Sequence, residues 1–280
     1  MKASAPGKIV LWGEYAVLDG APAAVLAVDR YAEVSLMTRA QGWQFRSRGF
    51  QTPGVDTPLP HFCQAPAAQV VEAILQAHGF AEYPQPFQIT SDTADFYDPT
   101  AKAKLGIGSS AAVCTATYRL LAELLKWTPS LQEAVQIHRA FQGGKGSGLD
   151  VAASWLGGTL RFSSVQSQVT ATPFTWPSDL HWSVIWTGTS SSTPQHLQSF
   201  SEWIAKNDIE PLDALAALSA DLFDDLTLEK LAAYQAQLQR LDDAAGVGNP
   251  LVPYTSGHQR CSTSVTVSAN TPFGGSKLGT

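Results

Sequence analysis

Hydrophobic residues alternate with polar or small residues in several short stretches of the chain, and this pattern predicts β-strands. We expect strands at Ile9–Trp12, Ala23–Val28, Tyr31–Met37, Phe87–Ser91, Thr159–Phe162 and Trp182–Thr187. Trp43–Phe50 is expected as part of an edge hairpin, followed by a loop over 53–60. The sequence contains no internal repeat.

Between the strands, apolar residues recur at the three- and four-residue spacing of helices. We expect helices at Ala67–Ala77, Ala111–Leu125, Leu131–Phe141, Asp150–Leu156 and Ser199–Lys206, and at Pro211–Leu241 with an interruption at Asp224-Asp225. Strands and helices that are mixed in this way predict an α+β fold.

The polar run over 163–178 is expected to join two halves, and 255–280 is rich in serine, threonine and glycine. That composition is typical of a flexible tail. The predicted organisation is a first domain over 1–165, a second over 180–254 and a disordered tail over 255–280.

Composition narrows the classes of protein that this chain can belong to. Of its 280 residues 44% are hydrophobic, which is enough for a substantial core, and a net charge of −6 argues against a nucleic-acid binder with a basic face. The three cysteines are far apart and form no disulfide framework, and Cys114 is expected to be a buried small residue. With no signal peptide or membrane-length apolar run, we expect a cytoplasmic protein without a membrane partner.

The stretch over 104–112, KLGIGSSAA, is the most informative part of the chain. Gly106 and Gly108 allow backbone angles that other residues resist, and Ser109 and Ser110 lead into the helix predicted from Ala111. A glycine-serine loop before a helix can cradle a phosphate, because unpaired N–H groups and the helix dipole both favour an anion. The loop is not a Walker A motif. The alternative is a simple turn before a helix.

Two further residues have possible chemical roles. Asp150 follows a glycine-rich turn, GKGSGLD over 144–150, and begins a helix, where its carboxylate would face a ligand and accept a proton. Lys8 follows Pro6-Gly7 at the start of a strand. The alternatives are an ordinary helix-start residue for Asp150 and an ordinary surface lysine for Lys8.

Taken together, three segments resemble motifs of the GHMP kinase superfamily: APGKIVLWGEYAVL over 5–18, the glycine loop, and GSGLD over 146–150. Within that superfamily the chain is most similar to the phosphomevalonate kinases, because Tyr15 follows Gly-Glu, Lys104 precedes the glycine loop, and WTGTSSSTP over 186–194 is similar to a segment of theirs. The resemblance implies a first half like domain 2 of ribosomal protein S5 and a ferredoxin-like, incomplete second half.

The resemblance also implies roles for individual residues. ATP would bind along Gly106, Ile107, Gly108, Ser109, Ser110 and Ala111. Phosphoryl transfer to 5-phosphomevalonate, giving 5-diphosphomevalonate for isoprenoid synthesis, would use Asp150 to orient or deprotonate the acceptor, and Lys8 and Lys104 to offset repulsion between two anions. The acceptor would contact Lys8, Glu14, Tyr15, Lys104, Ser147, Gly148, Ser192 and Thr193.

For Mg²⁺ the resemblance implies contact with Ser109 or Ser110. Mevalonate kinases carry a glutamate eleven residues before the aspartate, where this chain has Arg139, so a carboxylate ligand is not evident there. Arg139 and Lys145 would add positive charge, and His138 is expected to be structural.

One family motif, a Gly-x-Gly-Gly-Gly-Asp turn, has no counterpart, since Gly274-Gly275-Ser276 is too short. We therefore expect an end that is truncated or frame-shifted relative to the family. The alternatives to a phosphomevalonate kinase are a mevalonate kinase or another small-molecule GHMP kinase, and an ATP-binding member with impaired catalysis. The expected partners are ATP and a small-molecule acceptor, with a monomer or homodimer as the assembly.

Overall fold

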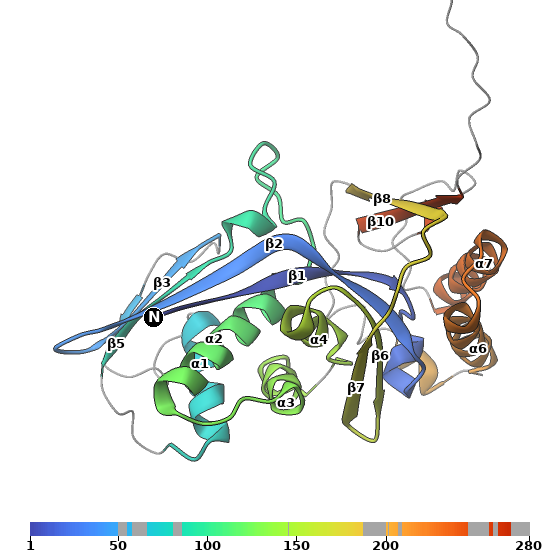
Figure 1. Ribbon diagram of the computed structural model, residues 1–280. Helices are drawn as coiled ribbons and strands as arrows, with labels where there is room; N and C mark the ends of the chain where they lie inside the picture. Colours follow the sequence, from blue (N-terminus) through green and yellow to red (C-terminus); the bar gives the residue numbers. More distant parts are fainter. Residues whose placement is uncertain are drawn as a thin grey trace, which may run out of the picture.

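Seven strands form the large sheet of the protein (Figure 1). The computed structural model describes residues 1–49, 55–57, 66–80, 86–144, 146–186, 200, 202–206, 209–245, 258–259 and 263–269. The order across the sheet is β4-β3-β5-β2-β6-β7, and β1 pairs with β2. The strands are β1 Lys2–Trp12, β2 Ala23–Thr38, β3 Trp43–Arg48, β4 Val55–Thr57, β5 Phe87–Asp92, β6 Thr159–Val165 and β7 Gln168–Pro173. All pairs are antiparallel except β3 with β5.

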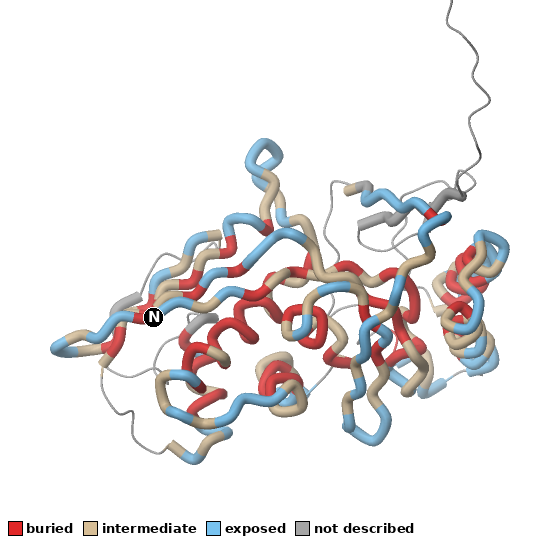
Figure 2. The backbone as a smooth tube through the Cα atoms, viewed as in Figure 1, coloured by how far each residue is buried: buried red, intermediate tan, exposed pale blue. Residues whose placement is uncertain are grey.

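Helices α1 to α4 lie together on one face of this sheet (Figure 1). They are α1 Pro66–Ala77, α2 Ser109–Leu125, α3 Leu131–Phe141 and α4 Leu149–Leu156, close to the expected ranges. Helix α2 is buried along nearly its whole length and packs on β1 and β2, as the red stretches of Figure 2 show. The inward residues of β5, Phe87 and Ile89, are also buried, so the main core lies between the sheet and α2.

Two strands that the pattern predicts separately, Ala23–Val28 and Tyr31–Met37, are one continuous strand, β2. The break between them is a bulge. Adjacent β1 residues Pro6 and Gly7 pair with Tyr31 and Val28, so Asp29 and Arg30 are extra residues on the β2 side. Because polar residues at a bulge interrupt the alternation without ending the pairing, the pattern alone could not join the two halves.

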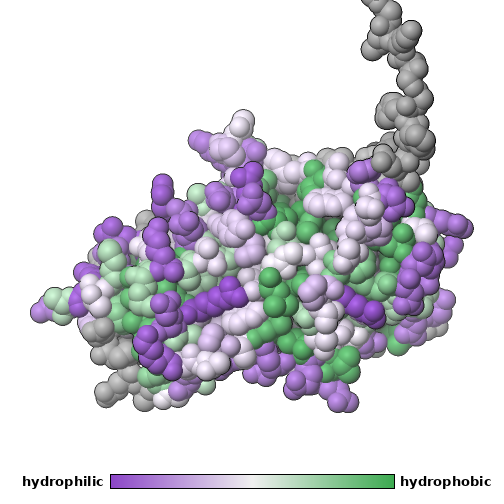
Figure 3. All heavy atoms as spheres, viewed as in Figure 1, coloured by the Kyte–Doolittle hydropathy of each residue, from purple (hydrophilic) through white to green (hydrophobic). Residues whose placement is uncertain are grey.

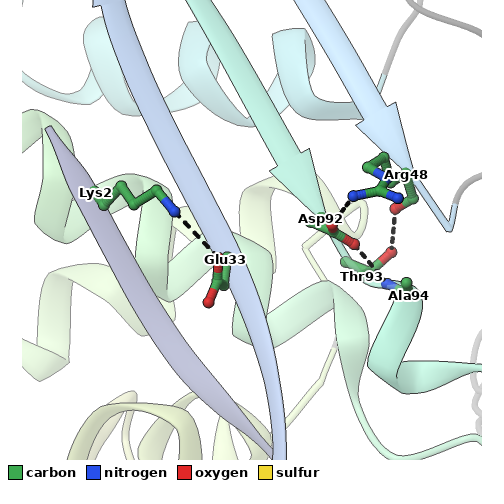
Figure 4. Close-up of polar contacts among 6 residues, drawn as sticks. All are labelled: Lys2, Glu33, Arg48, Asp92, Thr93 and Ala94. Carbon is green, nitrogen blue, oxygen red and sulfur yellow. Dashed lines mark hydrogen bonds and ion pairs between the residues drawn. The ribbon is translucent and has the colours of Figure 1, made fainter.

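Short polar contacts fasten the sheet at the end of β5 (Figure 4). Arg48 donates to Asp92 at 3.2 Å, Thr93 donates to the Arg48 carbonyl, and the other Asp92 oxygen accepts from Ala94 N at 2.9 Å. The last bond opens the short helix η3, Ala94–Phe96, which leads toward the glycine loop. The contact between Lys2 and Glu33 across β1 and β2, at 3.6 Å, is more exposed.

The polar run expected to join the halves, 163–178, instead contains a hairpin. β6 turns back into β7 at Gln166 and Ser167, which both have positive φ. Such angles fit a tight hairpin turn, and Val169 and Ala171 pack against the core. The expected loop over 53–60 contains β4, which pairs antiparallel with β3 at one end of the sheet, so Trp43–Arg48 is part of an edge hairpin as expected.

The second half contains β8 Leu180–Trp186 in a three-stranded sheet of order β8-β10-β9, with helices α6 Glu210–Asp224 and α7 Leu228–Ala245. Strands β9 His258–Gln259 and β10 Thr263–Ala269 fall within the expected tail, and β10 pairs antiparallel with β8. The β-branched residues of TSVTVSA favour a strand over 263–269. Together the two halves confirm the α+β class.

Helices α6 and α7 also hold the loop that follows β1. The Trp12 indole donates to the Ser219 carbonyl at 3.3 Å, and Trp12 packs against Phe223. The Ser219 hydroxyl in turn donates to the Pro22 carbonyl. Residues about two hundred positions later in the chain therefore contact and stabilise this early segment.

The surface seen in Figure 3 intersperses hydrophilic and hydrophobic side chains. The large apolar residues that are exposed include Met37, Leu156, Val165 and Trp182. Among the helices that the structure describes, none is long and apolar enough to cross a bilayer.

Candidate functional site

The glycine loop forms the amino-terminal end of α2 as the sequence predicts. Gly106 and Gly108 have φ of 78° and 81°, in the left-handed region that favours glycine, and Gly108 is the N-cap of α2 without a side-chain cap bond. The side chains of Ile107 and Ser109 are buried. The loop therefore offers a helix N-terminus whose first N–H groups are not capped by Gly108, which is an arrangement that can hold an anion.

Lys8 lies directly against this loop. Its backbone N–H donates to the Ile107 carbonyl at 2.8 Å, and a Cβ added at Gly108 would come within 3.0 Å of Lys8 Cγ. A Cβ at Gly7 would come within 2.5 Å of the same carbonyl, so the close approach of β1 requires glycine there. The structure thus brings the predicted lysine and the predicted loop together, although they are a hundred residues apart.

Asp150 lies on α4, a helix that packs against β1 and α2. It lies in the first turn of α4 after Gly148, whose φ is 90°. Burial raises the pKa of Cys114 on α2 to about 12, with a smaller contribution from the Asp150 charge. The Ser154 hydroxyl donates to the Pro6 carbonyl at 2.7 Å and joins α4 to β1. β1, α2 and α4 therefore pack against one another.

Arg139 holds the turn before Asp150. Its Nε donates to the Gly146 carbonyl at 2.9 Å, and one Nη donates to the Ser147 carbonyl at 2.5 Å and to Ser164 Oγ at 2.9 Å. Burial lowers the pKa of Arg139, and the Asp150 charge opposes that shift. Arg139, which stands where mevalonate kinases carry a glutamate, thus orients two backbone carbonyls through its planar guanidinium group.

Ser110 and His138 form a pair on neighbouring helices. Ser110 Oγ lies 3.1 Å from His138 Nε2, and His138 is only 1% exposed. The expectation that His138 is structural agrees with this burial. Hydroxyl and carboxylate oxygens suit Mg²⁺, so Ser110 together with Asp150 provides donors of the right type. In the described part of the chain, no three His, Cys, Asp or Glu side chains gather into a metal site.

Glu14 is surrounded partly by residues from the second half of the chain. The Tyr234 hydroxyl, from α7, donates to Glu14 Oε2 at 2.8 Å and accepts from Gly13 N–H at 2.7 Å. Burial raises the pKa of Glu14, while backbone and Tyr234 hydrogen bonds and the charge of Lys8 lower it, and Asp242 raises it. Sequence reasoning missed Tyr234, since nothing in the helical pattern of 211–241 marks one buried tyrosine as part of a site.

Tyr15 and Lys104 border this region. Tyr15 has a φ of 60°, which is uncommon for a residue other than glycine, and its ring packs on Phe200 with centroids 4.5 Å apart. Lys104 makes an isolated bridge with Tyr97 just before the glycine loop, and partial desolvation lowers its pKa. Ser147 and Gly148 form the turn held by Arg139, whereas Lys145, Ser192 and Thr193 lie outside the described residues.

Comparison with known proteins finds a family match over part of the chain. Residues 66–158 match the family profile described as GHMP kinases N terminal domain. The chain is 28% identical over 210 residues to a mevalonate kinase from Pyrococcus abyssi, a match that covers 69% of this chain and 58% of the relative. A second mevalonate kinase, from Pyrococcus horikoshii, is 28% identical over 203 residues. The match thus spans little more than half the length of these relatives.

Solved structures share the fold. A phosphomevalonate kinase from Streptococcus pneumoniae, in complex with phosphomevalonate and AMPPNP, has a TM-score of 0.73 at 15% identity, covering 97% of this chain and 93% of that one. The Lin0012 protein from Listeria innocua has a TM-score of 0.71 at 20% identity, covering 88% and 80%. The part of the chain over residues 66–158 is therefore similar to the N-terminal domain of GHMP kinases, and the chain shares its fold with these solved structures.

Proposed function

We propose that this protein transfers the γ-phosphoryl group of ATP to 5-phosphomevalonate. The observation that carries the proposal is that Lys8 lies against the glycine loop at the α2 N-terminus. Asp150, in the first turn of α4, supplies a carboxylate on a helix that packs against α2. An anion cradle, a cation and a carboxylate are the groups that phosphoryl transfer needs.

In this proposal the ATP phosphates lie over the backbone from Gly106 to Ala111. Uncapped N–H groups and the dipole of the 17-residue helix α2 would hold the negative charge. Lys8, which lies against Gly108, would neutralise the charge that develops on the transferred group. Lys104, with a lowered pKa, would offset the charge of a phosphorylated acceptor.

Asp150 would orient or deprotonate the acceptor oxygen. Because the acceptor is already a phosphate, positioning contributes more than base strength. Arg139 serves that positioning by fixing the Gly146 and Ser147 carbonyls. Glu14, Tyr15, Ser147, Gly148, Ser192 and Thr193 would complete the acceptor subsite.

Mg²⁺, when bound to the ATP phosphates, would supply charge neutralisation between the two anions. Ser110 and Asp150 are the groups whose oxygens suit it, with Ser109 as a further candidate. His138 keeps the Ser110 hydroxyl in one orientation.

A second candidate function is phosphorylation of mevalonate, which is favoured by relatives that are mevalonate kinases. Lys104 is the residue that argues against it. A lysine beside the glycine loop offsets the negative charge of a phosphorylated acceptor, but it stabilises a neutral hydroxyl group much less.

The test measures ADP release with ATP and Mg²⁺ in the presence of (R)-5-phosphomevalonate or of mevalonate. We expect turnover with phosphomevalonate and a loss of about 10²–10⁴-fold in kcat for Asp150→Asn. Turnover only with mevalonate would establish the second candidate. ATP binding without turnover of either acceptor would identify a protein with impaired catalysis.

A further inference from the structure

One oxygen of the Glu14 carboxylate accepts a hydrogen bond from a described residue, and the other oxygen does not. Oε2 accepts a hydrogen bond from Tyr234 at 2.8 Å. Oε1 is buried, and no described group donates to it. A buried acceptor without a donor raises the free energy of the folded state, so a donor that arrives with a ligand recovers that loss.

The direction of the Tyr234 hydrogen bond follows from the contacts of its hydroxyl. The Gly13 N–H can only donate, and it points to the Tyr234 oxygen at 2.7 Å. A phenol has a single proton, which is therefore available to Glu14 Oε2. Tyr234 is completely buried, so water does not compete for either bond.

The charges that face Glu14 come from two elements. Lys8 from β1 favours the ionised carboxylate, and Asp242 from α7 disfavours it. Burial raises the pKa of Glu14, whereas the bond from Tyr234 lowers it. Tyr234 thus opposes protonation of a carboxylate that is coupled to the lysine lying on the glycine loop.

We propose that Tyr234 is a positioning residue of the acceptor subsite, holding Glu14 by Oε2 so that Oε1 accepts a hydrogen bond from a hydroxyl group of the acceptor. This rests on the proposed function, since it assumes that Glu14 meets the acceptor. It assigns to α7, in the second half of the chain, a role in a subsite whose other described residues come from the first half.

The test compares Tyr234→Phe, Glu14→Gln and the double variant with the matched control Tyr118→Phe, which removes the hydroxyl of another buried tyrosine bound to a glutamate. Calorimetric titration gives the Kd for (R)-5-phosphomevalonate, mevalonate and ATP. We expect Tyr234→Phe to weaken acceptor binding about tenfold to a hundredfold and to leave the Kd for ATP unchanged. The double variant should be no weaker than Glu14→Gln alone. Tyr118→Phe should change neither Kd.

A second readout does not depend on any acceptor. Carbon-13 NMR of labelled glutamate carboxyls follows the titration of Glu14, which is assigned by its loss in Glu14→Gln. The midpoint should move to higher pH in Tyr234→Phe and stay in place in Tyr118→Phe.

An unchanged acceptor Kd in Tyr234→Phe, or additive losses in the double variant, overturns the proposal. If the wild-type protein binds neither acceptor, the proposed function fails. In that case the carboxyl titration still tests Tyr234: a shifted midpoint supports its hold on Glu14, and an unshifted midpoint overturns it.

Discussion

Two buried tyrosines make the same pair of hydrogen bonds in different parts of the molecule. Tyr118 accepts from Ser130 N–H and donates to Glu133, and Tyr234 accepts from Gly13 N–H and donates to Glu14. The first pair joins groups 12 and 15 residues apart, and the second joins groups 220 and 221 residues apart.

The two glutamates differ in their second oxygen. Glu133 Oε1 lies 3.1 Å from His78 Nε2, so both of its oxygens have neighbours, whereas Glu14 Oε1 has no described donor. Glu133 also lies in the first turn of α3, where its N–H donates to Oγ of the N-cap residue Ser130 at 3.2 Å. The Glu133 side chain is also partly exposed, so its second oxygen does not depend on a protein donor, whereas Glu14 Oε1 is buried. The comparison teaches that a buried carboxylate oxygen without a described donor is the feature that indicates a site.

The comparison is tested most directly by making the same substitution in both glutamates. We expect Glu14→Gln to lower kcat/KM for the acceptor by about tenfold to a hundredfold, because Oε1 loses its charge. Glu133→Gln should leave kcat/KM unchanged and lower the free energy of unfolding by about 1 kcal/mol. Steady-state kinetics and urea unfolding of both variants measure the two effects. Equal effects of the two substitutions on kcat/KM would show that the unengaged oxygen has no special role.

Arg139 also makes several hydrogen bonds to its partners, so a substitution there tests the same idea. Arg139→Lys keeps the charge but loses the fork, so we expect kcat to fall about tenfold while the KM for ATP stays constant. The control is Arg161→Lys, since Arg161 lies over the Phe223 ring. Full activity in Arg139→Lys would mean that only its charge matters.

The smallest expected effect is on the pH dependence of stability. Burial raises the pKa of Glu14 above its ordinary value, so the folded state binds its proton more tightly than the unfolded chain does. The contribution of Glu14 to the free energy of unfolding is complete when the pH is below its pKa in the unfolded chain. It is lost as the pH rises through the pKa of Glu14 in the folded state. A tenfold difference in proton affinity between the two states corresponds to about 1.4 kcal/mol.

Urea unfolding between pH 4 and pH 8 measures this slope, and these pH values are about the range in which a raised glutamate pKa acts. Glu14→Gln should remove its share of the slope. Tyr118→Phe should not, because the pKa of Tyr118, raised to about 12 by burial and by its bond to Glu133, lies far above the range. A slope that is the same in wild type and Glu14→Gln would contradict the raised pKa.

The sequence by itself determined the parts of the protein that depend on neighbouring residues. Helices α1 to α4 lie within two residues of their predicted starts, because apolar spacing and turn glycines act over a few positions. The glycine loop was predictable for the same reason, since Gly106 and Gly108 and the helix after them are consecutive. The Lys8 and Asp150 positions followed from a resemblance carried by short, contiguous motifs.

Only the tertiary structure decided which distant groups meet. The bulge that joins the two halves of β2, the pairing of β10 with β8 and the Tyr234 bond to Glu14 each depend on contacts between segments far apart in the chain. A helical pattern shows that Tyr234 is on an inward face, but it carries no information about what lies opposite. The orientation of one proton on that tyrosine depends on Gly13, which chain folding brings to it across 221 positions.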